Sequence, residues 1–357
     1  MRIGIDTLQL SNNSFSGIEN YVRNLLPELE KLRPGVELFE YKGRLVINRS
    51  FTRHFILPFY LNSQHLDVVH FPDHILPLLP INAKKIITVH DLAFIRHPEY
   101  YNPSKRWYKQ LLTPFSLKRA DKIIAVSEYT KSELIQIYHI SEDKITVVPN
   151  GISSLFRPKV LDRDSRERTL KRFGFDFDRF ILFAATLEPR KNLLTLLDSF
   201  EEIARHRGEI GLVICGKKGW LYEESLKRIE ALARLLKIKY LGYVSDENLV
   251  ELYNLAEVFV YPSFYEGFGF PPLEAMACGV PVVTSNVSSL PEVVGDAVLK
   301  VEPQDKGQIA KAILSVLDNK DLAREIVRKG QERAKMFTWE KTAAKTFEVY
   351  YNVIKSN

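Results

Sequence analysis

The stretch YEGFGFPPLEA, residues 265–275, decides the fold, because it connects a short apolar strand to a helix and carries two carboxylates on the way. The run 257–261 before it predicts the strand, and the paired prolines predict a first helical turn, where proline is tolerated. Glu266 then lies in the loop and Glu274 at the helix start. Both can face the crevice at the carboxyl end of a strand, where open α/β sheets bind ligands. A plain loop with two solvated glutamates is the simpler alternative.

Short β-rich runs alternate with longer helical patterns along almost the whole chain. Strands are predicted at 2–5, 36–41, 67–71, 85–89, 122–126, 144–148, 180–184, 211–215, 238–240, 258–261 and 280–284. Helices are predicted at 18–32, 105–118, 130–138, 192–204, 221–235, 246–255, 273–277 and 338–354. This alternation indicates parallel, doubly wound sheets, and two sets of similar length indicate two Rossmann-like α/β domains.

The boundary between the domains is visible as a polar segment without strand patterns at 157–171. We assign an N-terminal domain to 1–165, a C-terminal domain to 166–337 and a final helix to 338–357. We find no internal repeat and no low-complexity segment. Because no G-x-G-x-x-G motif follows the first strand, the sequence does not support a dinucleotide cofactor.

The composition is typical of a globular protein, with 45% hydrophobic and 26% charged residues among 357, a length that suits two domains. No run approaches the roughly 18 apolar residues of a membrane span. The first residues predict a strand and not a signal peptide. The two cysteines, Cys215 and Cys278, cannot form a disulfide framework and lie in apolar settings typical of buried thiols. These features predict a cytoplasmic protein.

The net charge of +6 comes from the first half of the chain. Residues 1–168 hold 24 Lys and Arg against 18 Asp and Glu, whereas residues 169–357 hold 26 of each. This asymmetry predicts an acidic partner for the first half, such as a lipid surface or a phosphorylated acceptor, with a random surface bias as the alternative. We find no recognition motif with interleaved aromatics, so a nucleic acid partner is not expected.

The whole string 265–275 resembles the E-x7-E signature of the retaining glycosyltransferases of family four, which adopt the GT-B fold. Other family-like stretches are E-P-R-K-N at 188–192, H-D at 90–91 and V-V-P-N-G-I at 147–152. Matches run from residue 2 to the final helix. The resemblance implies two Rossmann-like domains facing across a cleft, a last helix that packs back on the N-terminal domain, and hexose transfer from a nucleotide sugar.

Such a transfer needs positive charge where the leaving diphosphate develops negative charge. Arg190 and Lys191 lie between a predicted strand and a predicted helix, whose N-terminus adds N–H groups and a partial positive charge. We expect this pair to hold the diphosphate, although an isolated basic pair in a loop usually faces solvent. Gly17 would let the backbone approach phosphate before the first long helix. The family more often has two glycines there, and this chain has Ser16 before Gly17.

The remaining donor contacts are implied by the resemblance. Glu274 would hold the nucleoside, because a carboxylate can accept two hydrogen bonds from a ribose diol. Main-chain groups near Gly216 and Val244 would meet the base. The sugar would lie against Glu266, the side chain or backbone of His90, and the turn formed by Gly267, Phe268 and Gly269. Asp91 would orient the imidazole of His90 or touch the acceptor.

The resemblance also implies retention without a protein nucleophile, in which an oxygen of the leaving phosphate takes the proton of the acceptor. A nucleophilic Glu266 is the alternative, and we favour a contact from Glu266 to a sugar hydroxyl. Two D-x-D matches, at 162–164 and 176–178, lie in the polar boundary segment and before a strand. Neither is placed to reach phosphate, so we expect no essential metal and no cofactor beyond the donor.

Basic and apolar residues interleave at 48–57 and 105–119. This pattern is typical of helices that rest on anionic membranes, and also of buried helices with a solvated basic face. We therefore expect a weak, salt-sensitive peripheral contact with the inner face of the cell membrane, with the buried helix as the alternative.

The layout looks most like bacterial and archaeal mannosyltransferases that act on cell-surface polysaccharide or lipid-linked glycan. That impression implies GDP-mannose as donor and a glycan or lipid-linked acceptor. No residue chemistry selects GDP over UDP, so a UDP-hexose donor stays open. A nucleotide-sugar epimerase or phosphorylase of the same fold also stays open, and so does a non-enzymatic nucleotide-sugar-binding scaffold at the membrane.

Overall fold

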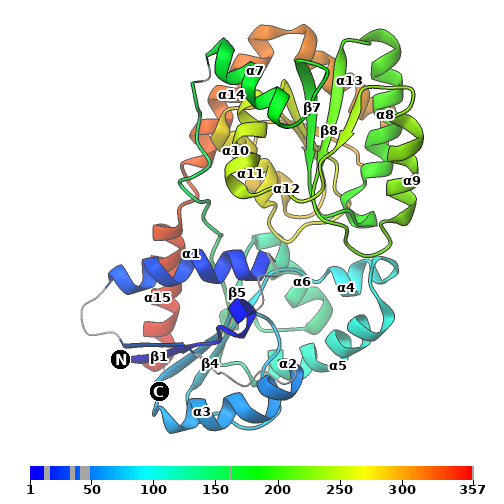
Figure 1. Cartoon of the computed structure of the whole chain (residues 1–357). Coiled ribbons are helices and arrows are strands. Elements are labelled where there is room, and N and C mark those ends of the chain that lie inside the picture. Colours follow the sequence, from blue (N-terminus) through cyan, green and yellow to red (C-terminus); the bar gives the residue numbers. More distant parts are fainter. Residues whose placement is uncertain (12–16, 33–36, 41–48, 161, 356–357) are drawn as a thin grey trace. The chain divides into compact units, whose positions relative to one another are not determined.

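The structure, a computed structural model, describes residues 1–11, 17–32, 37–40, 49–160 and 162–355. The chain divides into two compact units (Figure 1). The first consists of Met1–Gly151 with Phe337–Asn357, and the second of Ile152–Met336. Each unit contains a parallel sheet with helices packed on it. The predicted pair of doubly wound α/β domains is therefore confirmed.

In the described part of the first unit, six strands form a parallel sheet in the order β2-β1-β3-β4-β5-β6. The strands are β1 (Arg2–Ile5), β2 (Glu37–Glu40), β3 (Val68–Phe71), β4 (Lys84–Val89), β5 (Lys122–Ala125) and β6 (Ile145–Val147). The helices are η1 (Leu8–Ser11), α1 (Gly17–Leu32), α2 (Arg49–Phe51), the π-helix η2 (Thr52–Ile56), α3 (Leu57–Ser63), α4 (Ala93–Arg96), η3 (Pro98–Tyr100), α5 (Pro103–Arg119), α6 (Glu128–Tyr138), η4 (Glu142–Lys144) and α15 (Trp339–Lys355). The strand order reverses between β1 and β3, so their carboxyl ends form a topological switch point.

The second sheet has the order β12-β11-β10-β7-β8-β9 and is also parallel in the described residues. Its strands are β7 (Arg179–Ala184), β8 (Ile210–Cys215), β9 (Ile238–Tyr240), β10 (Val258–Tyr261), β11 (Val282–Ser285) and β12 (Leu299–Val301). The helices are α7 (Arg163–Arg172), η5 (Pro189–Lys191), α8 (Leu193–His206), α9 (Glu223–Leu232), α10 (Asp246–Leu255), α11 (Phe270–Cys278), α12 (Leu290–Val294), α13 (Lys306–Asp318) and α14 (Lys320–Ala334). Counted from β7, this is the Rossmann order, with its switch point between β7 and β10.

The second sheet is covered on both faces. Figure 1 shows α8, α9 and α13 on one side and α10, α11 and α14 on the other. The central strands are accordingly apolar along their whole length, as expected of a doubly covered parallel sheet. All of β8 and β10 is buried, and the core continues from Ile181 and Phe183 of β7 to Leu196 and Phe200 of α8.

The final helix α15 belongs to the first unit and packs along α1. Tyr350 of α15 and His70 of β3 share a hydrogen bond of 2.6 Å between the phenol oxygen and Nδ1. The other ring nitrogen of His70 bonds Thr88 of β4 at 2.7 Å. Burial, with the neighbouring His90, lowers the pKa of His70 to about 3, so the imidazole is neutral and serves as one donor and one acceptor. The helix is thus attached to the sheet by a polar contact inside the core.

The sequence prediction differs from the structure at several elements. It omitted β12, α13 and α14, and it placed the domain boundary after residue 165, which lies inside the second unit. The segment after Gly151 already packs there, since Phe156 meets Tyr253 edge to face and the N–H of Lys159 bonds Asn254 at 2.6 Å. Within the described residues, we find no helix that combines the length and the apolar character needed to cross a membrane.

We predict that Tyr350→Phe destabilises the first unit. The change leaves a buried imidazole nitrogen of His70 without its partner, which costs about 1–3 kcal/mol of unfolding free energy. Urea denaturation of the purified variant measures this loss. Tyr351→Phe, one residue further along the same helix and half-exposed, is the matched control and should change stability by less. Equal stabilities of the two variants would show that the buried contact contributes nothing.

Candidate functional site

The switch point of the second sheet carries a cluster of buried and largely buried charges from two of the predicted motifs. Arg190 and Lys191 end the short helix η5 that follows β7, and Glu266 follows β10. Since β7 and β10 are hydrogen-bonded neighbours, the two loops leave the sheet side by side. The strand order therefore brings the basic pair and the first glutamate of the 265–275 stretch together.

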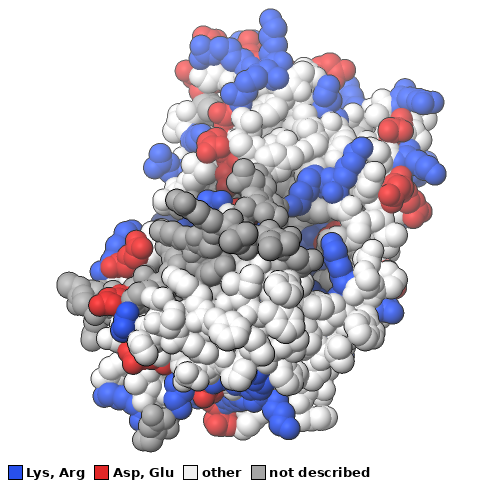
Figure 2. All heavy atoms as spheres, turned by 60° about the horizontal axis from the view of Figure 1, so that its bottom comes forward, with Lys and Arg blue, Asp and Glu red and all other residues white. Residues whose placement is uncertain are grey.

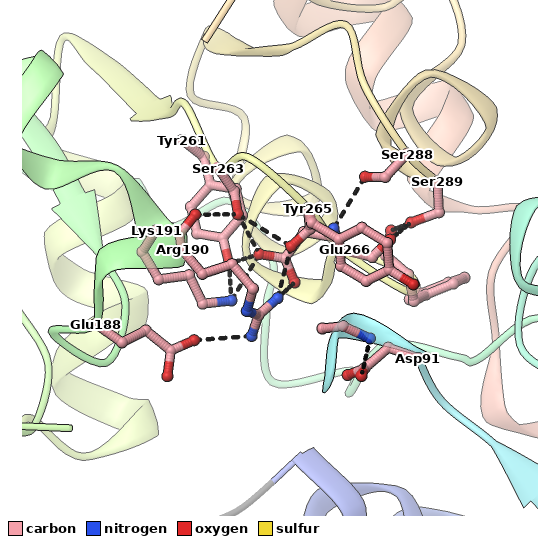
Figure 3. Close-up of polar contacts among 12 residues, drawn as sticks. Asp91, Glu188, Arg190, Lys191, Tyr261, Ser263, Tyr265, Glu266, Ser288 and Ser289 are labelled. Atoms are coloured by element: carbon pink, nitrogen blue, oxygen red, sulfur yellow. Dashed lines mark hydrogen bonds and ion pairs between the residues drawn. The ribbon is translucent and has the colours of Figure 1, made fainter. Parts of the chain in front are cut away.

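Among the described residues, four side chains donate hydrogen bonds to the Glu266 carboxylate (Figure 3). Lys191 Nζ lies 2.6 Å and Ser263 Oγ 2.7 Å from Oε1. The Tyr261 hydroxyl reaches the same oxygen at 2.9 Å, and Arg190 reaches Oε2 at 3.1 Å. The carboxylate is buried, and both of its oxygens are used.

The charges in this cluster stabilise one another. Burial alone would raise the pKa of Glu266, but the charges of Arg190 and Lys191 outweigh it and bring the pKa down to about 2. Burial and Arg190 lower the pKa of Lys191, and Glu266 opposes this shift. Glu266 is therefore ionised at any physiological pH and supplies the negative charge that keeps the buried Arg190 and the largely buried Lys191 in place.

Both cations have further contacts within the second unit. Arg190 bonds the buried Glu188 at 2.8 Å and the main-chain oxygen of Tyr265 at 2.6 Å. Lys191 bonds the Tyr261 hydroxyl at 2.8 Å. Asn192 follows in a left-handed conformation with φ of 58° at the N-cap position of α8, and its side-chain amide donates to the main-chain oxygens of Pro262 and Pro303 at 2.9 and 2.6 Å. The basic pair is thus fixed before α8 and does not point freely into solvent.

The turn at 267–269 is fixed by serines from the loop after β11. The Glu266 N–H donates to Ser288 Oγ at 2.9 Å, and Ser289 Oγ donates to the oxygens of Glu266 and Phe268 at 2.9 and 3.1 Å. Gly269 has φ of 105°, and a Cβ there would lie 2.7 Å from Leu290, so this position requires glycine. The buried turn of Gly267, Phe268 and Gly269 ends where α11 begins.

Glu274 lies in the second turn of α11 and has a different environment. It is buried beside Tyr253 of α10, whose hydroxyl is 3.5 Å from Oε2. Burial and the charge of Asp246 raise the pKa of Glu274 to about 8, against the opposing effect of the Tyr253 hydrogen bond. The two glutamates of the motif therefore differ in ionisation near neutral pH.

Gly216 connects the loops that follow three adjacent strands. Its N–H bonds the oxygen of Gly242 at 2.7 Å, and the Tyr240 hydroxyl bonds the Gly216 oxygen at 2.9 Å. Its φ is 143°, and a Cβ would lie 1.7 Å from the oxygen of Ala185, so no side chain fits. Val244 follows in the partly buried loop between β9 and α10.

The other predicted site residues belong to the first unit. His90 follows β4, and its Nε2 donates to the oxygen of Pro72 at 3.0 Å, which leaves Nδ1 as the acceptor nitrogen. Burial lowers the pKa of His90, so the ring is neutral. Asp91 Oδ1 accepts the N–H of Ala93 at 3.1 Å (Figure 3). Gly17 begins α1, and the preceding residues 14–16 lie outside the described part of the chain.

Comparisons with known proteins identify the family. The family "Glycosyl transferases group 1" matches residues 165–333, and "Glycosyltransferase Family 4" matches residues 15–154. The O-antigen chain mannosyltransferase B of Escherichia coli is 38% identical over 287 residues, which cover 79% of this chain and 74% of that protein. The chain belongs to the family-four glycosyltransferases.

Solved structures similar to this glycosyltransferase show the same fold. Sucrose-phosphate synthase from Thermosynechococcus elongatus superimposes over the full length of both chains with a TM-score of 0.80 at 22% identity. Anabaena HepE in complex with UDP-glucose covers 99% of this chain and all of its own, with a TM-score of 0.76 at 16% identity. At these identities the likeness concerns the fold alone, and it is the expected GT-B fold.

Sequence patterns did not reveal several residues that build the glycosyltransferase's charge cluster. Tyr261 is the last residue of β10, and Ser263, Ser288 and Ser289 follow the ends of β10 and β11. The available signal was their polarity at or after the end of a buried strand. What spacing could not give is the loop conformation that turns Tyr261 and Ser263 onto Glu266. In the part of the chain that the structure describes, we find no group of three His, Cys, Asp or Glu side chains arranged to hold a metal ion.

We predict that Glu266→Gln lowers sugar transfer by about 10²–10³-fold, because the amide cannot neutralise Arg190 and Lys191, whose placement sets the charge stabilisation. Steady-state transfer kinetics with a titration of donor binding measure the effect. Glu188→Gln is the matched control. It removes a buried carboxylate from Arg190 but leaves the contact between Glu266 and Lys191, so the loss of transfer activity should be smaller. A covalent glycosyl adduct trapped on Glu266 would contradict the positioning role.

Proposed function

We propose that this glycosyltransferase is a retaining, metal-independent hexosyltransferase that moves mannose from GDP-mannose to a glycan or lipid-linked acceptor. The observation that carries the proposal is the buried cluster of Arg190, Lys191 and Glu266 at the switch point of the second sheet. Two fixed cations at the carboxyl end of β7 suit a diphosphate leaving group, whose negative charge grows as the sugar departs.

In this proposal Glu266 positions the cations and does not react. A carboxylate with a pKa of about 2 that accepts four hydrogen bonds is a weak base and a weak nucleophile. The bond from the anomeric carbon to the phosphate oxygen breaks, and the acceptor oxygen forms the new bond on the same face. The acceptor proton passes to the phosphate oxygen that leaves. Such a route retains configuration and asks the protein for orientation and charge.

The other predicted site residues suit the remaining parts of the donor and the acceptor. The acceptor nitrogen Nδ1 of the neutral His90 suits a hydrogen bond from a sugar hydroxyl, and Glu274 suits the ribose. Gly17, at the start of α1, suits a close approach to phosphate. Asp91, Gly216, Val244 and the turn at 267–269 complete the expected donor and acceptor contacts. The arginine, lysine and helix termini supply positive charge in place of a metal ion.

We choose mannose as the transferred sugar because relatives of this chain are mannosyltransferases, among them an O-antigen chain mannosyltransferase. A role in polysaccharide synthesis follows in the same way. HepE, which holds UDP-glucose, keeps a UDP-hexose donor as the alternative. An epimerase or a non-catalytic scaffold would use the same donor site without a glycan acceptor. We further propose that the enzyme works in the cytoplasm, peripherally at the inner face of the cell membrane.

Hydrolysis of GDP- and UDP-sugars without acceptor, in the presence of a chelator, tests the proposal. We expect release of GDP from GDP-mannose, and its loss in Arg190→Ala and Lys191→Ala. Release of UDP from a UDP-hexose would instead favour the alternative donor. Activity that disappears with chelator and returns with magnesium or manganese would contradict metal independence. If a donor stabilises the protein against heat but no acceptor supports sugar transfer, the non-catalytic scaffold would be favoured.

We predict that donor binding releases a proton. Because burial gives Glu274 a pKa of about 8, the carboxyl is mostly protonated at neutral pH and must ionise to accept two ribose hydrogen bonds. The donor dissociation constant should then fall about tenfold per pH unit up to about pH 8 and level off above it. Calorimetric titration in buffers of different ionisation enthalpy measures the proton. Glu274→Gln should bind weakly at every pH, and an unchanged pH slope in this variant would exclude Glu274 as its source.

A further inference from the structure

The segment 49–63 of the first unit, formed by α2, η2 and α3, buries polar side chains in its first half, next to the buried apolar Leu57 and Leu61 of its second half. Its polar residues Thr52, Arg53 and His54 are buried, whereas Phe51, Phe55 and Phe59 are exposed. Phe59 is 70% exposed. A surface helix normally turns its apolar stripe toward the core and its charges toward water. We expected the basic residues of 48–57 to face outward, and at Arg53 that expectation is wrong.

Ion pairs at the switch point of the first sheet hold this orientation. Arg53 lies 3.0 Å from Asp73, which follows β3, and 3.4 Å from Asp6, which follows β1. Both carboxylates are buried, and their charges raise the pKa of Arg53 against the effect of burial. His54 Nε2 bonds the Tyr108 hydroxyl of α5 at 2.7 Å. With its polar side fixed inward, the helix presents its three phenylalanines to the outside.

Helix α5 adds a second exposed apolar stripe beside the first. Trp107, Leu111 and Phe115 recur every four residues and are exposed, Trp107 by 66%. The bond between His54 and Tyr108 joins the two elements, and the loop 77–80 lies against both. Arg119 of α5 bonds the oxygen of Pro77 at 2.7 Å, and Asn62 of α3 bonds that of Pro80 at 3.2 Å.

The segment 49–63, the loop 77–80 and α5 together carry many of the exposed apolar side chains. Of the fourteen large hydrophobic residues that are exposed in the described residues, seven lie on it. We call them the docking surface: Phe51, Phe55, Phe59, Leu78, Trp107, Leu111 and Phe115. Scattered single apolar residues are normal on a soluble protein, whereas a contiguous group of this kind marks an interaction site.

The two helical segments that carry most of the docking surface hold charges of one sign. The segments 49–63 and 103–119 contain seven Lys and Arg and no Asp or Glu. Figure 2 turns the side of α2, α3 and α5 forward and shows a broad area without charged side chains, with Lys and Arg along its lower edge and some Asp and Glu among them. Lys105 and Lys118 are exposed at the two ends of α5. Like charges on two copies would repel, so this pattern disfavours self-association and fits an anionic, apolar partner.

We propose that the docking surface binds an anionic lipid bilayer, with the aromatic side chains at the boundary between headgroups and acyl chains. Aromatic rings prefer that depth, and lysine and arginine extend past them to the lipid phosphates. The proposal names the site of the peripheral contact included in the proposed function, but it depends on neither the donor nor the transfer reaction.

Sedimentation with phosphatidylcholine vesicles, with and without phosphatidylglycerol, tests the site. We expect binding that needs phosphatidylglycerol and weakens at about 1 M salt, where the Debye length falls to about 3 Å. The combined variant F51S/F55S/F59S and the combined variant K105E/K118E should each bind at least tenfold more weakly. The matched controls in the second unit are Leu235→Ser, at an exposed leucine, and K227E/K237E, at two exposed lysines, and these should bind as the parent does.

A second readout reports the contact directly. Trp107 fluorescence should be quenched by brominated lipid, and the quenching should disappear in Trp107→Phe while Trp220 and Trp339 remain. Circular dichroism and donor hydrolysis show whether each variant is folded, and hydrolysis without acceptor should be unchanged. The proposal would be overturned if the parent protein did not bind the vesicles at low salt, or if all variants bound equally. It would also be overturned if F51S/F55S/F59S converted a parent dimer to monomers, because the surface would then belong to a contact with a second copy.

Discussion

The buried carboxylate of Glu266 is the constraint on which the second unit's site depends. It draws two cations from the loop after β7 and two hydroxyl groups from β10 and its loop onto one group. Its own main chain is held by Ser288 and Ser289 from the loop after β11. Three loops that leave neighbouring strands are thereby joined at one point. Without that negative charge, Lys191 would lose its ion-pair partner Glu266, and Arg190 would be left with Glu188. A largely buried cation that loses its partner destabilises the fold by more than the ion pair stabilises it.

The same motif places its second carboxylate in the opposite electrostatic state. Glu266 is buried among opposing charges that bring its pKa to about 2, whereas burial and the like charge of Asp246 raise the pKa of Glu274 to about 8. One group is a permanent counter-ion and the other responds to a ligand. Two titratable groups with pKa values pushed apart in one site usually have separate tasks. Because both groups are glutamates, the difference between their pKa values comes from their surroundings, which the loop sets for Glu266 and the helix for Glu274.

The fold was largely predictable because parallel strands covered on both faces are continuous apolar runs. The strands at 2–5, 238–240 and 258–261 have the predicted bounds, and most others differ by one or two residues. By contrast, β12 is a three-residue edge strand with a lysine at its centre, and α14 contains Gly330 among many charges. That glycine packs closely on Met276, a tertiary reason invisible in the sequence. At the site, Arg190, Lys191 and Glu266 follow from strand-end position, whereas the inward turn of Ser263 and the burial of Arg53 depend on partners distant in sequence.

Arg53 shows how a switch point can determine a surface. In the second sheet, cations after β7 meet a carboxylate after β10, and all come from loops at the strand ends. In the first sheet, the carboxylates Asp6 and Asp73 follow β1 and β3, but their cation comes from the helix that packs over them. Because that helix contributes Arg53 inward, the residues on its opposite side must face outward, and these are the phenylalanines. The exposure of Phe51, Phe55 and Phe59 is therefore a consequence of buried ion pairing. An apolar surface fixed in this way cannot rotate into the core without breaking both ion pairs.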